Sequence, residues 1–394
     1  MPPSTCAIPI RNTSPRARFK ATSASGAVCW VGFSCSATLL SPVRWRRSTK
    51  KVSPSRSHPR ATPGISPPPT GSEGSPSPKG SPPLIQQPSL PVRDINRLLW
   101  NAETTFTVPT RIHCGIGAFD RLAALVPGAR VLVLHGRSAQ MLLERVRMLL
   151  AGRALHFLHV PSGEPTTDSV DGILRHARAA APDALVGIGG GSVMDTAKAT
   201  AALLCEDPGA SCADFLEVDG TRHLSGKSVP TVTVPTLFGS GAEVTRNAVI
   251  FNPRTGAKRS LRHDALFPAV ALVDPDLGLT APRAARLAAA VDAWCHLTET
   301  LCSTRATPFT LPLSAEGMRL LLPVLPELPD DQTTATAAAC ASALGGIALT
   351  NAGLTFGHGV GAVLGPAAGI SHGQACGLLL PEVLAWCLSH LPED

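Results

Sequence analysis

The sequence predicts an α/β fold in which a doubly wound domain is followed by an all-helical domain and preceded by a disordered tail. Three observations predict it. Residues 1–100 are basic and rich in proline, residues 101–280 alternate short apolar runs with helical stretches, and residues 281–394 contain only helical patterns. We therefore expect three regions, with boundaries near residues 100 and 280.

The first hundred residues have the composition of a disordered segment. They hold 14 Lys or Arg, only two acids and 17 of the 37 prolines, for a net charge of +12. The whole chain carries +7, so residues 101–394 carry −5 and give no reason to expect nucleic-acid binding by the folded part. So little apolar content cannot offset the entropy of ordering a backbone, and we expect most of this tail to be disordered. Binding of the tail to nucleic acid or a membrane surface stays an alternative.

The tail also has features of a targeting segment. Residues 1–72 contain no acid and many Ser, Thr and Arg, as in an organellar transit peptide. The apolar run at residues 27–40 is shorter than the ~20 residues that a membrane helix needs, but it fits the core of a signal sequence. A misplaced start codon upstream of a bacterial enzyme explains the tail equally well. The compartment therefore stays open between an organelle and the cytoplasm.

The α/β region begins with apolar runs that fit buried strands. Residues 130–134 end at His135-Gly136, and residues 183–188 run directly into glycines. A helical pattern follows at residues 192–204. Further strands are expected at residues 154–160, 229–234, 248–251 and 270–273. Strands that alternate with helices predict a doubly wound sheet.

After Asp274-Pro275 the character of the sequence becomes helical. Four Ala/Leu-rich stretches with helical periodicity predict the second domain, at residues 283–303, 313–326, 331–350 and 373–391.

The eleven cysteines are expected to be reduced. They include no C-x-x-C pair, and a disulfide framework is unusual in a domain of this size. The same spacing gives no support to a cysteine-type zinc site. We therefore interpret Cys205, Cys212, Cys295 and Cys302 as reduced core residues.

A glycine-rich turn joins the strand at residues 183–188 to the following helix. Glycines there let the backbone approach a pyrophosphate, and the helix start offers unpaired N–H groups and a positive dipole end. Ser192 stands at a capping position with Asp195 three residues later, in the spacing of a capping box. A tight strand-to-helix turn alone also needs glycines for steric reasons, so this turn is a candidate phosphate site with a plainer alternative.

Four polar residues in the helical region could bind a metal ion. Asp292 and His296 are four residues apart, which places both side chains on one face of a helix. His358 and His372 flank a glycine-rich stretch. Three imidazole nitrogens and one carboxylate oxygen suit Fe²⁺ or Zn²⁺ and leave a position open for a substrate oxygen. Taken singly, the Asp/His pair is more often a surface hydrogen bond, and His358 more often a core histidine.

Together these patterns resemble the iron-containing, or group III, alcohol dehydrogenase superfamily. Residues 189–198 reproduce its Gly-Gly-Gly-Ser-x-x-Asp-x-x-Lys signature. Residues 234–245 are similar to a family loop that covers the cofactor, from which Leu237, Ser240 and Ala242 depart, while Thr236 and Glu243 remain. The resemblance covers roughly residues 104–391.

The resemblance implies a nicotinamide cofactor and a metal site. The family's metal ligands are an Asp and a His four apart and two His fourteen apart, and Asp292, His296, His358 and His372 reproduce both spacings. The ion would act as a Lewis acid on a carbonyl or alkoxide oxygen while the nicotinamide exchanges hydride, with no catalytic residue expected beyond the metal site. Lys258 matches a family lysine near the nicotinamide ribose. The expected cofactor contacts are Gly136, Arg137, Gly189, Gly190, Gly191, Ser192, Asp195, Thr236, Leu237, Ser240 and Lys258.

The cofactor is expected to be NAD(P), with a preference for NADP. Many relatives carry an acid after the first strand that binds the adenosine ribose. Here Gly136 stands at that position, followed by Arg137 and Ser138, which suits a 2′-phosphate. A solvated loop arginine is the alternative interpretation of Arg137.

Two features depart from the family. Many relatives have a further His four residues after the first of the late pair, where this sequence has Ala362. The family also continues through several more helices beyond the stretch that includes Pro381, so we expect the helical domain to be truncated in this chain.

The predicted function is interconversion of a small alcohol with its aldehyde or ketone. Maleylacetate reductases, which often replace the metal-binding Asp by Asn, are the nearest alternative, but Asp292 is intact. A polyol or glycerol dehydrogenase, a dehydroquinate synthase relative and an inactive remnant stay open. The expected partner is a small-molecule substrate, with no nucleic acid and no membrane, and a homodimer is the candidate assembly.

Overall fold

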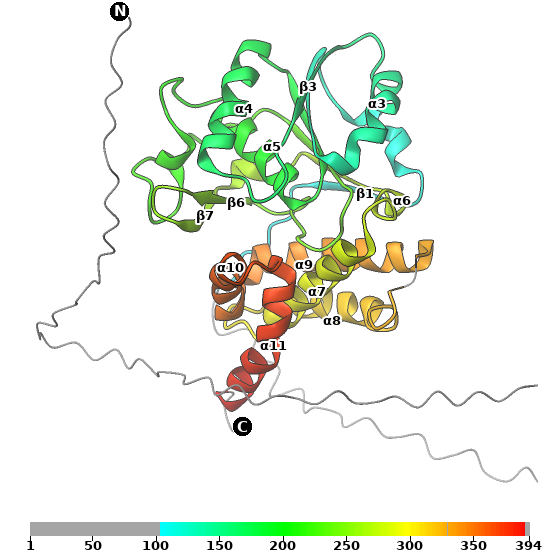
Figure 1. Ribbon diagram of the computed structural model, residues 1–394, viewed down its shortest axis with the longest axis vertical. Helices are drawn as coiled ribbons and strands as arrows, with labels where there is room; N and C mark the ends of the chain where they lie inside the picture. The colour runs from blue at the N-terminus through cyan, green and yellow to red at the C-terminus, as the bar shows by residue number, and fades with distance from the viewer. Residues whose placement is uncertain (1–102, 329, 391–394) are drawn as a thin grey trace, which may run out of the picture. The chain divides into compact units, whose positions relative to one another are not determined.

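The computed structural model describes residues 103–328 and 330–390, whose elements all belong to one unit of the chain, Leu84–Asp394. Figure 1 shows an α/β layer and a helical layer within this unit. The predictions for the tail at residues 1–100 lie outside the described residues.

The α/β layer is built on a parallel sheet of six strands. The strand order is β1-β8-β5-β4-β2-β3, with every neighbouring pair parallel. This arrangement confirms the predicted α/β fold class. The strands are β1 (Arg111–Cys114), β2 (Arg130–His135), β3 (Ala154–His159), β4 (Ala184–Gly189), β5 (Thr231–Pro235) and β8 (Val270–Val273).

Both faces of the sheet are covered by helices, because side chains alternate along each strand. Val131 and Val133 of β2 belong to an apolar cluster with η1, α2, α3 and α6. Leu132 and Leu134 face the opposite cluster, with α4 and α5. The α helices are α2 (Leu122–Leu125), α3 (Leu143–Leu149), α4 (Thr167–Ala180), α5 (Gly191–Leu203) and α6 (Pro275–Gly278), and the 3₁₀ helices are η1 (Ala118–Arg121), η2 (Arg137–Leu142), η3 (Cys212–Phe215) and η4 (Asp264–Leu266).

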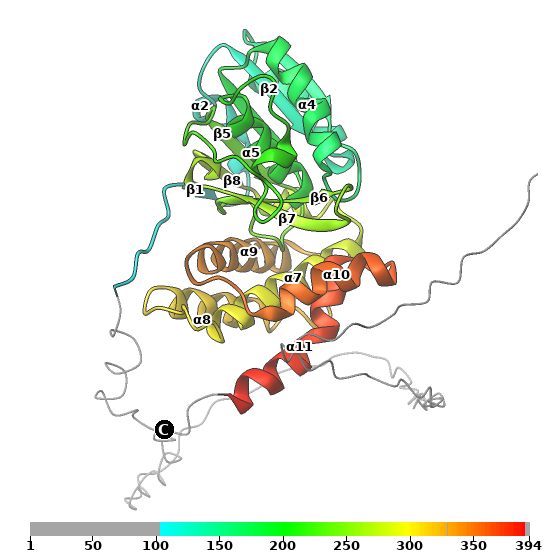
Figure 2. The ribbon, with the colours of Figure 1, turned by 90° about the vertical axis from the view of Figure 1, so that its left-hand side faces the viewer.

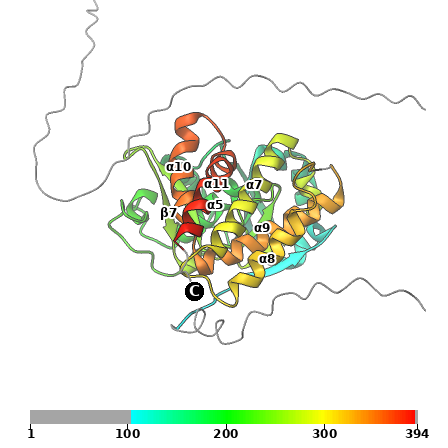
Figure 3. The ribbon, with the colours of Figure 1, turned by 90° about the horizontal axis from the view of Figure 1, so that it is seen from below.

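The helical layer contains five helices over the described residues (Figures 2 and 3). The longest of these helices, α9, packs against both α7 and α8. By length and composition alone α9 could cross a membrane, but 56% of its apolar stretch is buried, as in a core helix of a folded domain. The five helices are α7 (Arg283–Leu301), α8 (Thr310–Leu321), α9 (Gln332–Ala352), α10 (Phe356–Ala368) and α11 (His372–Ser389).

The structure differs from the sequence predictions at several elements. The strand expected at residues 248–251 is β6 (Asn247–Asn252), which pairs antiparallel with β7 (Ala257–Arg262) outside the parallel sheet. Neither β1 nor β7 was predicted, because both are short and largely polar or exposed. The helix α10 escaped prediction because its glycines and an internal proline mask the helical pattern.

The loop between β5 and β6 connects the two layers. Gly241 has a φ of +64°, and a Cβ there would lie 2.4 Å from the Cα of Gly346 in α9. Its N–H donates to the Ser342 hydroxyl at 3.2 Å, and that hydroxyl in turn donates to the buried carboxylate of Glu243 at 3.2 Å. Close backbone approach at this point brings the sheet's carboxyl edge against the helical layer.

Candidate metal and cofactor site

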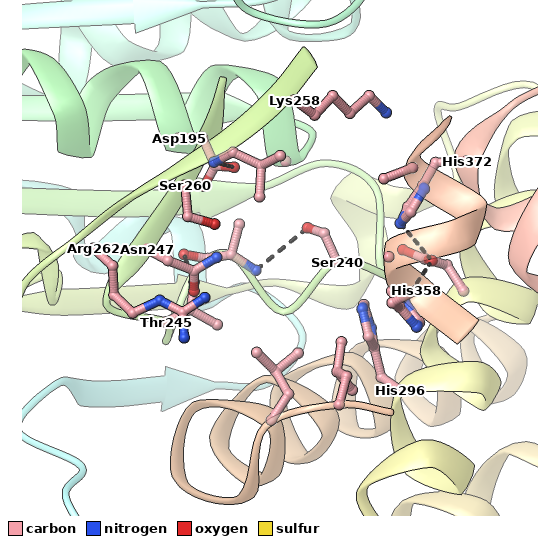
Figure 4. A pocket seen from close by; sticks show the side chains of 18 of the residues that line it. Asp195, Ser240, Thr245, Asn247, Lys258, Ser260, Arg262, His296, His358 and His372 are labelled. Carbon is pink, nitrogen blue, oxygen red and sulfur yellow. Dashed lines mark hydrogen bonds and ion pairs between the residues drawn. The ribbon is translucent and has the colours of Figure 1, made fainter. Parts of the chain in front are cut away.

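A cavity of about 600 Å³ lies between the α/β and helical layers. Its α/β wall includes the start of α5, the β5–β6 loop and the β6–β7 hairpin. Its helical wall includes three histidines from α7, α10 and α11. Figure 4 shows His296, His358 and His372 on the right, across from Asp195 and Ser260, with Lys258 above them.

The histidines and one carboxylate converge from three helices. Asp292 and His296 lie one turn apart on α7, His358 is in α10, and His372 opens α11. The Oδ1 atom of Asp292 lies 3.5 Å from His358 Nε2 and 3.8 Å from His372 Nε2. The rings of His296 and His358 stack with centroids 4.3 Å apart. The structure thus brings all four predicted ligand residues together.

His296 and His358 each form a hydrogen bond through Nδ1, which leaves Nε2 as the ring nitrogen that faces the cluster. His358 Nδ1 donates to Glu299 Oε1 at 2.6 Å. His296 Nδ1 donates to the Gly239 carbonyl at 3.1 Å. Because each acceptor requires the proton on Nδ1, Nε2 of both rings is the acceptor nitrogen in the neutral imidazole.

Two buried atoms at the centre of the cluster have no hydrogen-bond partner, Asp292 Oδ1 and His358 Nε2. A buried polar atom left unpaired costs about 1–3 kcal/mol, so such atoms are uncommon in native structures. Here a carboxylate oxygen and a ring nitrogen face the same small space, 3.5 Å apart, where a proton or a cation can lie between them. This donor set fits a divalent metal ion of the Fe²⁺ or Zn²⁺ type.

The electrostatics of the cluster favour a positive charge at its centre. Burial alone would raise the pKa of Asp292, but His296, His358 and His372 together hold it below its usual range. Burial lowers the pKa of His296 to about 4, so this imidazole is neutral near pH 7. Burial also opposes protonation of His358, yet Asp292, Cys376 and Glu299 raise its pKa well above the ordinary value. The carboxylates therefore attract a proton or a cation to this point.

A thiol that the sequence analysis did not single out also belongs to the cluster. Cys376 lies one turn after His372 on α11, with Sγ 3.6 Å from His372 Nε2. Ligand atoms of Asp292, His358, His372 and Cys376 all lie within 4.8 Å of one another. Burial would raise the pKa of this thiol, but His358 and His372 lower it. The spacing of four from His372 is the signal that could have identified it.

The glycine turn reaches the cavity at the N-terminus of α5. The helix begins at Gly191, with Gly190 as an extended N-cap and no side-chain cap. The predicted capping box is therefore wrong, because the helix starts one residue before Ser192 and the Asp195 carboxylate accepts a hydrogen bond from the Val249 N–H at 3.0 Å instead. The open helix start retains the N–H groups and the dipole end that suit a phosphate.

Two glycines of the turn are required by close contacts. A Cβ at Gly189 would lie 2.8 Å from the Cβ of Val193, and one at Gly191 would lie 2.8 Å from Ser240 Oγ. Gly190 has ordinary space. Steric need therefore explains both Gly189 and Gly191, and Gly191 also lines the cavity beside Ser240.

The Asp-x-x-Lys part of the signature holds the fold together. Lys198 is fully buried, and its Nζ forms a 2.9 Å ion pair with Asp195. The same ammonium donates to the Ala242 carbonyl and the Thr245 hydroxyl, both at 3.0 Å. The pair thus fastens the β5–β6 loop to α5, while Asp195 also lines the cavity.

The remaining predicted cofactor residues gather at the carboxyl ends of neighbouring strands. Gly136 follows β2, Thr236 and Leu237 follow β5, and the Thr236 N–H donates to the Gly189 carbonyl at 2.9 Å. Ser138 Oγ and Thr236 Oγ1 are 2.8 Å apart. These residues do not line the cavity itself, and neither does Arg137, which is exposed at the start of η2. They lie at the sheet edge where dinucleotides bind in open α/β folds.

Lys258 in β7 lines the cavity and forms an ion pair with Glu164. Ala362 of α10 also lines it, so no titratable side chain occupies that position.

Arg305 also lines the cavity, and nothing in the sequence pattern had indicated it. Glu299 escaped notice too, although its spacing of seven from Asp292 places both on one face of α7.

The cysteines of the described residues are free. Cys212 and Cys295 are buried as expected, but Cys205 is exposed and Cys302 is only partly buried. The interpretation of these two as core residues is therefore wrong, since each lies near the end of its helix, where neighbouring elements no longer cover the side chain.

The fold and the cavity define a class of protein in which a parallel α/β sheet and a helical layer enclose a polar cavity lined by histidines. The family model for iron-containing alcohol dehydrogenase matches residues 109–275, and that for the C-terminal region of the Fe-containing alcohol dehydrogenase family matches residues 286–393. The chain belongs to the iron-containing alcohol dehydrogenase family.

Individual relatives agree with this assignment. Long-chain-alcohol dehydrogenase 1 of Geobacillus thermodenitrificans is 33% identical over 71% of this chain and 72% of its own length. The iron-containing alcohol dehydrogenase of Thermotoga maritima has a similar structure, with a TM-score of 0.65 and 30% identity over 72% of this chain and 79% of that one. The sulfoacetaldehyde reductase of Bifidobacterium kashiwanohense, solved with NAD⁺, has a TM-score of 0.65 and 26% identity over 71% and 76% of the two chains.

Proposed function

We propose that this protein is a metal-dependent, NAD(P)-linked dehydrogenase that interconverts a small alcohol and its aldehyde or ketone, with Asp292, His296, His358 and His372 as the metal-binding residues. The observation that carries the proposal is the pair of unpartnered buried atoms, Asp292 Oδ1 and His358 Nε2, on the wall of the cavity. When bound, a divalent metal supplies Lewis-acid polarisation of the substrate oxygen.

Other residues around the cavity orient the imidazoles and bind the cofactor. Glu299 and the Gly239 carbonyl hold two imidazoles in the tautomer that points Nε2 inward. The start of α5 and Ser240 offer N–H and hydroxyl groups for the cofactor's phosphates, opposite the histidines. This arrangement supports a cofactor that extends from the sheet edge toward the histidines, which would bring its nicotinamide close to a substrate held there.

The preference for NADP is part of the proposal and rests on Arg137. It is exposed beside Ser138 at the carboxyl end of β2, where no acid is present to repel a 2′-phosphate. The similar sulfoacetaldehyde reductase was solved with NAD⁺, so the ratio of kcat/KM values for NADPH and NADH decides this point.

The test uses full-length protein reconstituted anaerobically with Fe²⁺ and assayed for NADPH and NADH oxidation with small aldehydes and maleylacetate. We expect chelator-sensitive turnover. His358→Ala should lower turnover by about 10³-fold or more, because metal polarisation contributes several kcal/mol, while NAD(P)H binding measured by fluorescence persists. His156→Ala, at an exposed position of β3, is the matched control. A fully active His358→Ala variant would contradict the proposal, and turnover with maleylacetate alone would favour the reductase alternative.

A further inference from the structure

Arg305 differs from the other cationic side chains that line the cavity, because it has no acidic partner in the described part of the chain. The other four lie on the α/β wall, and each forms an ion pair: Arg246 with Asp264, Lys258 with Glu164, Arg259 with Asp219, and Arg262 with Glu217. The guanidinium of Arg305 forms no ion pair and donates no hydrogen bond within residues 103–328 and 330–390. Its charge is therefore not neutralised by these residues.

The backbone around Arg305 is held in place by hydrogen bonds. Arg305 lies in the turn between α7 and α8, where its N–H donates to the Ser303 hydroxyl at 3.2 Å. That hydroxyl donates in turn to the Ala352 carbonyl at the end of α9, at 2.6 Å. The turn is thus fastened to α9, so the guanidinium extends into the cavity wall from a fixed point.

The guanidinium lies against Gly353, the residue that follows α9. Gly353 has a φ of +69°, and a Cβ there would lie 3.0 Å from Arg305 Cζ and closer still to a terminal nitrogen. Any other residue would strain this backbone conformation and displace the guanidinium. Gly353 also lines the cavity, so it leaves space for the cation at the cavity wall.

A short path of chain connects this place to the histidine cluster. Two residues after Gly353, the Thr355 hydroxyl donates to Glu299 at 2.6 Å, and the same carboxylate accepts from His358 Nδ1 at 2.6 Å. Steps of about 3.8 Å per residue, followed by the first turn of α10, place the Gly353 Cα within about 13 Å of the His358 Cα. This span fits a small substrate with its carbonyl at the histidines and its far end at Arg305.

The position of Arg305 favours contact with the substrate over contact with the cofactor's phosphates. The proposed phosphate site, at the start of α5 and Ser240, belongs to the α/β wall. Arg305 belongs to the helical wall, as do His296, His358 and His372. A guanidinium presents a planar set of N–H donors that matches a carboxylate in a bidentate pair.

We propose that Arg305 binds an anionic group at the far end of the substrate, so that the preferred substrate is a short aldehyde or ketone that carries such a group. This inference rests on the proposed function and names the substrate class of the same site. The cation adds binding energy for a charged substrate, whereas a neutral aldehyde of equal length gains nothing from it. Arg305 thus determines specificity and takes no part in the hydride transfer.

The test compares 4-oxobutanoate with butanal, which has the same chain length and no carboxylate. Full-length protein reconstituted anaerobically with Fe²⁺ and assayed with NADPH should prefer 4-oxobutanoate in kcat/KM. Arg305→Gln should lower kcat/KM for 4-oxobutanoate by about 10–100-fold, mainly through KM, and change that for butanal by less than about twofold. Arg305→Lys, which keeps the charge without the planar donor set, should fall between them. Arg319→Gln, at an exposed arginine of α8, is the matched control.

Several outcomes would overturn the inference. Wild-type turnover without preference for 4-oxobutanoate would overturn it and leave the proposed function intact. Equal losses for both aldehydes in Arg305→Gln would indicate a structural role, and a rise in the KM for NADPH alone would assign the residue to the cofactor. Circular dichroism checks that the variants fold.

A binding measurement separates the failure of this inference from the failure of the proposed function. If no aldehyde gives chelator-sensitive turnover, the proposed function fails, and calorimetry with 4-hydroxybutanoate then tests the anion site without catalysis. Binding that is about tenfold weaker in Arg305→Gln than in the wild type would support the site. Equal binding, or no binding to the wild type, would overturn it.

Discussion

Two buried polar clusters flank the same cavity and differ in how their charges are paired. In the Lys198 cluster, the ammonium contacts the Asp195 carboxylate, the Ala242 carbonyl and the Thr245 hydroxyl within 3.0 Å. In the histidine cluster, Asp292 Oδ1 and His358 Nε2 have no hydrogen-bond partner and face each other at 3.5 Å, a longer separation than the 2.9 Å between Lys198 Nζ and Asp195 Oδ1.

The difference separates a structural role from a ligand-binding one. A buried ammonium surrounded by a carboxylate and neutral acceptors is satisfied by the protein itself, so it fastens a loop and needs nothing else. An inward carboxylate oxygen and an imidazole lone pair are satisfied only by a cation or a proton. Lys198, which belongs to the family signature, therefore has a structural role. The histidine cluster of the helical layer has the groups that need a cation or a proton.

The largest effect is expected from removing the buried ammonium. Lys198→Met should lower the free energy of unfolding by roughly 3–5 kcal/mol, because it leaves Asp195 and the loop carbonyls without their partner. Urea unfolding followed by circular dichroism measures the change. Lys227→Met, at an exposed lysine, is the control and should change stability by less than about 0.5 kcal/mol. A loss below about 1 kcal/mol for Lys198→Met would show that Lys198 does not have this structural role.

The next effect concerns stabilisation by metal binding at the histidine cluster. Zn²⁺ or Fe²⁺ at about 100 times its dissociation constant should raise the free energy of unfolding by about 2.7 kcal/mol. Asp292→Asn should abolish most of this gain, because it removes the anionic oxygen at the centre, whereas Lys198→Met should keep it. Thermal unfolding with metal and with chelator provides the measurement. If Asp292→Asn gains as much as the wild type, the cluster is not where the metal binds.

The smallest effect is expected from Glu299, the carboxylate that accepts a hydrogen bond from His358 Nδ1. Glu299→Gln removes the charge that holds His358 Nδ1–H and should weaken metal binding by about 10–100-fold, or roughly 1.4–2.7 kcal/mol. Competition against a chelator of known affinity measures this loss. Glu316→Gln, at an exposed position of α8 paired with Arg319, is the matched control. Equal metal affinities in the two variants would show that Glu299 does not support the site.

Local patterns predicted most of the strands and the helices α5, α7, α8, α9 and α11, but none of α2, α3, α4 and α6. Apolar runs such as residues 130–134 and 270–273 became strands of the parallel sheet, and the four helical stretches after Asp274 became α7, α8, α9 and α11. The short polar strands β1 and β7 were missed because their pairing depends on neighbours rather than on their own composition. The helix α10 was missed because glycine lowers helix propensity, so that α10 depends on packing, mainly against α11, for its stability.

In the candidate site, too, some residues were found from the sequence and others only from the tertiary structure. The sequence alone placed Asp292 and His296 on one helical face, because a separation of four is one turn, and family spacing added His358 and His372. Only the tertiary structure brought Glu299 behind His358, the Gly239 carbonyl behind His296, and Cys376 beside His372. These contacts form between elements whose relative positions are set by packing across the whole chain, such as the close approach of Gly241 to Gly346. Periodicity is a local property of the chain, whereas the partner of a buried nitrogen depends on which helix lies next to it.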